Sequence, residues 1–129
     1  MDVTVVTWGY ALHRALPIAE ALAEQGISVE IIDPRWLDRA SFDREAVLES
    51  VGRTGALVIA EDALRSFGMG AAILDHLMPD LFGLLRTAPL RVTGDDVFSP
   101  VSRPLERHVH IRDADIEAAI VAAARAAHP

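Results

Sequence analysis

The apolar residues of the chain fall into short runs separated by stretches of helical periodicity. The runs at residues 3–7, 28–33, 56–60 and 89–93 have the length and β-branched content of strands. A strand that is apolar on both faces must be covered on both faces, so these runs indicate a parallel sheet between layers of helices. The residues expected in its central strands are Val5, Val6, Ile31, Val58, Ile59 and Val92.

Between the strand-like runs, apolar residues recur at three- and four-residue steps, which is the spacing of amphipathic helices. Residues 12–23 carry such a stripe, and Pro17 inside it predicts a kink or a later start. Asp43 is placed to cap a second helix, a third is expected over about residues 68–79, and the last begins near Asp113. Strands that alternate with helices predict an α/β fold.

The composition favours a single globular domain over residues 1–129, without a nucleic-acid or membrane partner. Apolar residues make up 51% of the chain, and the net charge of −7 opposes contact with phosphate backbones and anionic lipids. No apolar run is long enough to cross a bilayer and the chain opens without a signal-like leader, so we expect a soluble, cytoplasmic protein. The absence of Cys, Lys and Asn removes thiolate metal sites, a Schiff-base lysine and asparagine ligands.

Glycine turns are the main candidates for a binding site. Ligands of doubly wound sheets lie beyond the carboxyl ends of the strands, where Gly9, Gly68 and Gly70 could present backbone N–H groups to an anion. Alternatively, these glycines only let a helix pack close to the sheet. His108 and His110 could chelate a metal or could be solvated, since no third ligand stands at a diagnostic spacing. We predict no catalytic, cofactor-binding or metal-binding residue in this chain.

A family pattern runs through the chain from end to end. Its segments are Val3-Thr-Val-Val-Thr-Trp-Gly, Gly26-Ile-Ser-Val-Glu-Ile-Ile-Asp-Pro-Arg-Trp-Leu, residues 48–62, Phe67-Gly-Met-Gly-Ala, Leu90-Arg-Val-Thr-Gly-Asp-Asp and Asp115-Ile. In this order and spacing they resemble the C-terminal domain of the β subunit of the thiamine-diphosphate-dependent decarboxylating component in pyruvate and branched-chain 2-oxo acid dehydrogenase complexes.

The resemblance implies a transketolase C-terminal-like fold, a three-layer sandwich with a mostly parallel five-stranded sheet, one strand antiparallel and helices on both faces. It also implies that thiamine diphosphate and Mg are bound by other domains of the parent enzyme and not by this one. Gly94-Asp95-Asp96 matches the family's Gly-Asp-Gly cofactor motif only in part, because the second glycine and the downstream Asn are missing. Ala60 and Ala72 stand where the family usually has a His and an acidic residue.

Three hypotheses on function follow. The first is a β-subunit domain that is inactive alone and contacts other domains or the α subunit, a second copy of itself and the acyltransferase core. The second is the equivalent domain of a deoxyxylulose-phosphate synthase or a transketolase, suggested by Asp33-Pro-Arg-Trp. The third, from another class, is a free-standing regulatory module that binds a small anion or a protein partner.

A contact surface is predicted at the loops that follow the second and third strands. Trp36 and Leu37 follow one strand, and Ser66 and Phe67 follow the other, so all four lie at the same end of a parallel sheet. Exposed aromatic patches tend to be contact sites. The resemblance implies that the corresponding domain takes part in subunit pairing, and we therefore expect these residues to mediate dimerisation. The alternative is that Trp36 and Phe67 only cover the end of the sheet in the monomer.

Overall fold

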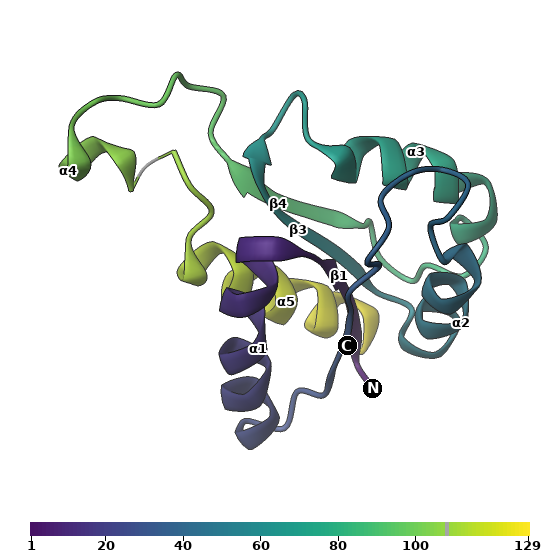
Figure 1. Cartoon of the computed structure of the whole chain (residues 1–129). Coiled ribbons are helices and arrows are strands. Elements are labelled where there is room, and N and C mark those ends of the chain that lie inside the picture. The colour runs from purple at the N-terminus through teal and green to yellow at the C-terminus, as the bar shows by residue number, and fades with distance from the viewer. Residues whose placement is uncertain (108) are drawn as a thin grey trace.

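The computed structural model describes residues 1–107 and 109–129 of the chain (Figure 1). Strands and helices alternate along most of the chain, as the periodicity predicts. The elements are β1 (Val3–Thr7), α1 (Gly9–Glu24), β2 (Val29–Ile32), α2 (Arg44–Thr54), β3 (Leu57–Leu64), α3 (Met69–Leu81), β4 (Leu90–Gly94), α4 (Arg103–Glu106) and α5 (Asp113–Ala127).

The sheet has the strand order β2-β1-β3-β4, and every neighbouring pair is parallel. The α/β class and the parallel sandwich are therefore confirmed, whereas the expected count of five strands, one of them antiparallel, is wrong for the described residues. The connection from β4 to α5 forms the short helix α4 and loops instead of a further strand. Pro100 and Pro104 interrupt that connection, and a proline cannot donate a hydrogen bond to a neighbouring strand.

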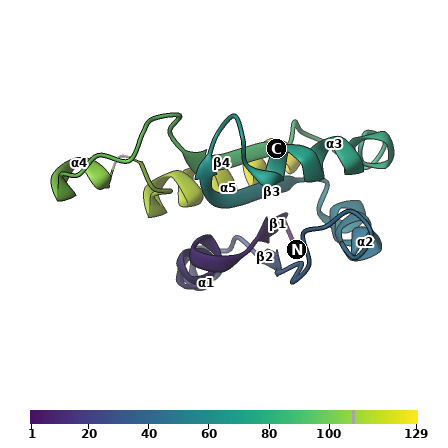
Figure 2. The same ribbon diagram turned by 45° about the horizontal axis from the view of Figure 1, so that its top comes forward.

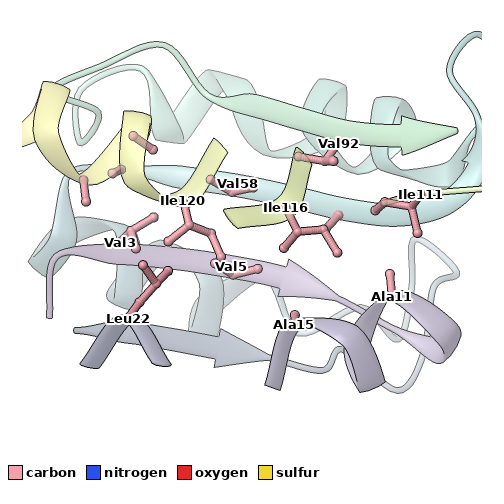
Figure 3. Close-up of a cluster of buried hydrophobic side chains, with 14 of the residues drawn as sticks. Val3, Val5, Ala11, Ala15, Leu22, Val58, Val92, Ile111, Ile116 and Ile120 are labelled. Carbon is pink, nitrogen blue, oxygen red and sulfur yellow. The ribbon is translucent and has the colours of Figure 1, made fainter. Parts of the chain in front are cut away.

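The two central strands are β1 and β3, and their side chains alternate between two apolar cores. Val5 and Val58 face the core formed with α1 and α5, while Val6 and Ile59 face the core formed with α2 and α3. Figure 2 shows α1 and α2 on opposite sides of the strands, and Figure 3 shows the core that α1 and α5 cover.

Two of the residues expected in central strands lie in edge strands instead. Ile31 belongs to β2 and Val92 to β4, which form the two edges of the sheet. Val92 is nevertheless buried because α5 packs against β4, while Ile31 is only partly buried. The apolar run around each residue was therefore a correct indication of a strand but not of its position in the sheet.

Three of the four predicted helices begin close to the expected residues, whereas the later start expected for the first helix is wrong. Asp43 caps α2, accepting a hydrogen bond from the Ala46 N–H at 3.1 Å. α1 begins at Gly9, earlier than its apolar stripe suggests, and continues through Pro17, whose ring lies on the exposed side of the helix. None of the helices in the described part of the chain is long and apolar enough to cross a bilayer.

Candidate functional site

The carboxyl ends of β1 and β3 lie at the end of the sheet where a ligand site is expected. From β1 the chain moves outward to β2 and then crosses back to β3 on the other side of β1, so the strand order reverses between β1 and β3. Parallel α/β sheets bind their ligands at such a reversal point, beyond the carboxyl ends of the strands. The loops at this end of the sheet carry Trp36, Leu37, Ser66 and Phe67, and the first turns of the helices that follow carry Gly9 and Gly70.

The turn at the start of α3 already holds an anion, the carboxylate of Glu61. Glu61 is 1% exposed, and its two carboxylate oxygens accept the Gly70 N–H at 3.0 and 3.1 Å. The Arg91 guanidinium of β4 donates to the same carboxylate at 2.8 Å. The positive end of α3 and the guanidinium together compensate the buried negative charge. The group that Gly70 was expected to offer to a ligand is therefore used inside the protein.

The glycines of this turn are required by the close approach of Glu61. A Cβ atom at Gly70 would lie 2.5 Å from one Glu61 oxygen, and a Cβ atom at Gly68 would overlap the same carboxylate. This geometry matches the alternative considered for Gly68 and Gly70, in which the glycines serve close packing. The sequence does carry a signal for it, an acidic residue directly after a buried apolar run and shortly before a Gly-x-Gly turn.

The start of α1 borders an open cleft of about 610 Å³. The cleft is lined by Tyr10, Asp62, Arg103, Glu106, Arg107 and His110. Asp62 accepts hydrogen bonds from His110 Nδ1 and from the Ile111 N–H, each at 3.0 Å. His108, the other half of the predicted histidine pair, lies outside the described residues. The His110–Asp62 pair was not predicted, because its members are 48 residues apart in the chain.

The four residues of the predicted contact surface have different environments. Trp36 is 66% exposed and Phe67 is 86% exposed. Leu37 is partly buried against the α2–α3 core. Ser66 ties its loop to the end of β4, because its backbone N–H and hydroxyl donate to Asp96 at 2.9 and 2.5 Å. The Ser66 hydroxyl and backbone N–H lower the pKa of the Asp96 carboxyl.

A smaller pocket of about 160 Å³ joins the loop after β2 to α3. Its lining includes Leu37 and Phe42 from the loop and Met69 and Ile73 from α3. The segments that contain Trp36 and Phe67 therefore border the same part of the surface, since each aromatic residue is within two positions of a lining residue. The topology thus brings together the two loops that the sequence placed at one end of the sheet.

Gly94-Asp95-Asp96 does not fit a site for thiamine diphosphate and its metal. A Cβ atom at Gly94 would overlap the Val109 carbonyl oxygen, so this glycine serves close backbone packing. The Asp96 carboxylate is bound to Ser66, and the chain has no Asn to complete the family's motif. Among residues 1–107 and 109–129, no cluster of three or more His, Cys, Asp or Glu side chains is arranged to hold a metal ion.

Comparisons with known proteins agree with the fold. The family model described as the transketolase C-terminal domain matches residues 1–116. The pyruvate dehydrogenase E1 component subunit beta of Acholeplasma laidlawii is 35% identical over 107 residues, which are 83% of this chain and 32% of that protein. The 2-oxoisovalerate dehydrogenase subunit beta of Bacillus subtilis is 33% identical over 125 residues, 92% of this chain and 36% of that protein.

A third relative, the acetoin:2,6-dichlorophenolindophenol oxidoreductase subunit beta of Cupriavidus necator, is 36% identical over 126 residues, 96% of this chain and 35% of that protein. A solved structure described as a split-gene transketolase, an inactive β4 tetramer, superposes with a TM-score of 0.77 at 31% identity over 98% of this chain and 40% of the other. The chain spans about a third of the length of these curated relatives. It belongs to the transketolase C-terminal domain family and is related to the β subunits of 2-oxo acid dehydrogenases.

Proposed function

We propose that this chain is the C-terminal domain of the β subunit of a thiamine-diphosphate-dependent 2-oxo acid dehydrogenase component, and that it acts in subunit assembly. Relatives named as pyruvate and 2-oxoisovalerate dehydrogenase β subunits support the parent enzyme. The solved relative, described as a tetramer, supports a role in association. The other domains or the α subunit of the parent enzyme, a second copy of this chain and the acyltransferase core are the proposed partners.

The observation that carries the assembly role is the exposure of two aromatic side chains at one edge of the sheet. Trp36 is 66% exposed and Phe67 is 86% exposed, so neither covers the end of the sheet as a buried side chain would. Aromatic side chains contribute strongly to protein interfaces, because each can bury about 150–250 Å² of surface. The partly buried Leu37 and the Ser66–Asp96 hydrogen bonds hold the two loops that present them.

Sedimentation equilibrium of the purified chain tests this role. We expect a concentration-dependent dimer that is weakened by roughly 1–3 kcal/mol in Trp36→Ala or Phe67→Ala. Phe82→Ala is the matched control, because Phe82 is 81% exposed but follows α3 at its other end. A wild type that remains monomeric at high concentration would refute the proposed surface. An equal loss of dimer in Phe82→Ala would refute its location.

The proposal also places catalysis outside this chain. The residues at Gly94-Asp95-Asp96 do not fit the cofactor, and positioning a 2-oxo acid against a bound cofactor requires groups that this domain lacks. We expect the purified chain neither to decarboxylate pyruvate or 3-methyl-2-oxobutanoate nor to bind thiamine diphosphate with magnesium. Isothermal titration calorimetry that returned a micromolar Kd for the cofactor would contradict this part of the proposal.

A further inference from the structure

We propose that the cleft at the carboxyl ends of β1 and β3 binds a small anion that carries a carboxylate or phosphate group. The cleft measures about 610 Å³, which lies within the range of small-molecule sites. It lies at the reversal point of the strand order, on the face of the sheet that α1 and α5 cover. This role does not depend on the proposed assembly function.

Two arginines and a tyrosine supply the hydrogen-bond donors of the cleft lining. Arg103 and Arg107 contribute guanidinium groups, Tyr10 a phenol and His110 an imidazole. A guanidinium presents several N–H groups in a plane and so suits the bidentate recognition of carboxylate or phosphate oxygens. Glu106 and Asp62 are the acidic residues of the lining, and their formal charges equal those of the two arginines, so recognition of the ligand depends on the geometry of the donated hydrogen bonds.

Asp62 orients the histidine of the cleft, and its carboxylate already accepts hydrogen bonds from two groups of the protein. Its carboxylate accepts the Ile111 N–H at 3.0 Å, which fixes the side chain to the backbone before α5. The same carboxylate accepts from His110 Nδ1 at 3.0 Å, so Nδ1 carries a hydrogen and Nε2 of the neutral ring is an acceptor, suited to a hydroxyl group of the ligand or a protonated phosphate oxygen. An imidazole held in this way loses little conformational freedom when a ligand binds.

The first turn of α1 adds unfilled hydrogen-bonding capacity beside the cleft. α1 begins at Gly9 without a side-chain cap and without an acidic residue in its first turn, so its positive end is not compensated locally. Independently, the hydroxyl of Thr7 is buried and has no hydrogen-bond partner among the described residues. Thr7 ends β1 two residues after Val5, and by strand alternation it shares the sheet face that Val5 and α1 form.

The charge distribution favours a small anion over a polymer. The whole chain carries a net charge of −7, which repels nucleic acids and anionic membranes at long range. The two arginines of the cleft attract an anion only over the few ångströms of the cleft itself. A metabolite-sized carboxylate or phosphate is small enough to bind within this short range, whereas an anionic polymer would be repelled by the rest of the chain.

Titration of the ¹⁵N-labelled chain with inorganic phosphate and, separately, with pyruvate tests the site by NMR at constant ionic strength. We expect saturable shifts of the amide signals of Gly9, Tyr10 and Ile111 with a Kd of about 1 mM or tighter for at least one probe. A preference for one probe identifies the anionic group that the cleft recognises. The absence of saturation with both probes would overturn the proposal.

Charge variants localise the binding. Arg107→Gln should weaken it about fivefold or more, and Glu106→Gln should tighten it, because one removes a donor and the other a repulsive charge. Arg125→Gln is the matched control, since Arg125 is an exposed arginine in the last turn of α5, far along the helix from the cleft. An equal loss in Arg107→Gln and Arg125→Gln would show unspecific screening and overturn the site. Because Trp36→Ala should bind as the wild type does, failure of the assembly role would be distinguishable from failure of this site.

Discussion

Substitution of Gly68 by alanine should destabilise the fold through a single neighbour, Glu61. A Cβ atom at Gly68 would lie 2.6 Å from the Glu61 carboxyl carbon and 2.8 Å from one of its oxygens, and it meets no other group as closely. Gly68 has φ −72° and ψ 149°, an extended conformation that alanine adopts without strain. The whole cost of the new methyl group therefore comes from displacing the buried carboxylate.

The size of this cost follows from the contacts that the carboxylate would lose. Glu61 accepts hydrogen bonds from the Gly70 N–H and from Arg91, whose side chain is only 16% exposed. A hydrogen bond to a charged group contributes about 1.5–3 kcal/mol, and breaking a buried ion pair costs about 3–5 kcal/mol. Because the displaced carboxylate keeps part of these contacts, we expect Gly68→Ala to cost about 2–4 kcal/mol.

A double-mutant cycle separates this mechanism from a general disturbance of the turn. Glu61→Ala alone should cost about 3–5 kcal/mol, and in that background Gly68→Ala should cost less than about 1 kcal/mol because the space is empty. Glu61→Gln keeps the side-chain volume, so Gly68→Ala should remain costly there. Urea unfolding followed by circular dichroism gives the four free energies of each cycle. A similar cost of Gly68→Ala in the wild type and in Glu61→Ala would refute the argument.

Two further expectations use other parts of the fold. Gly94→Ala should lower the unfolding free energy by about 3 kcal/mol or more, because its methyl group would overlap the Val109 carbonyl oxygen. Gly52→Ala should instead raise it by up to about 1 kcal/mol, because the new methyl group inside α2 meets nothing within 4 Å. Equal urea midpoints of the two variants would contradict both expectations. The Ser50 hydroxyl, which donates to Glu30 at 2.6 Å, lowers the pKa of Glu30 below its ordinary 4.5. The stability that Glu30 contributes is therefore fully present above its unfolded-state pKa and is lost as the pH falls through its folded-state pKa. The stability advantage of the wild type over Glu30→Gln should shrink in acid. A pH-independent difference in urea midpoints would contradict this expectation.

The strands and helices were predictable because they depend on local periodicity. The run at residues 3–7 coincides with β1, and the run at 89–93 differs from β4 by one residue at each end. β3 extends four residues beyond its apolar run, to Leu64, because pairing with β4 resumes at Leu64 and Gly94 after a register shift that follows Ala60. Carboxylates inside a strand are satisfied by partners distant in sequence, and hydropathy cannot detect such partners.

The arrangement of the strands and the roles of the site residues depend on long-range contacts. Pairing with β1 places β2 at an edge, and no local pattern around Ile31 encodes that neighbour. Glu61 meets Arg91 across 30 residues, and His110 meets Asp62 across 48. Trp36 and its neighbour Leu37 are equally apolar in the sequence, yet one is mostly exposed and the other packs against the core. The sequence therefore predicted which loops lie at the carboxyl ends of the strands, but not which partners their side chains contact.

Two consecutive carboxylates of β3, Glu61 and Asp62, have different partners because successive side chains of a strand point to opposite faces of the sheet. Ile59 faces the α2–α3 core and Ala60 the α1–α5 core, so strand geometry directs Glu61 to the start of α3 and Asp62 to the cleft beside α1. On the first face the helix start is filled by the protein's own carboxylate. On the second face the Asp62 carboxylate accepts from His110 and from the backbone before α5, and it makes no cap for α1. The two glycine turns therefore differ, because the Gly70 N–H is bound to Glu61 whereas α1 begins without a side-chain cap.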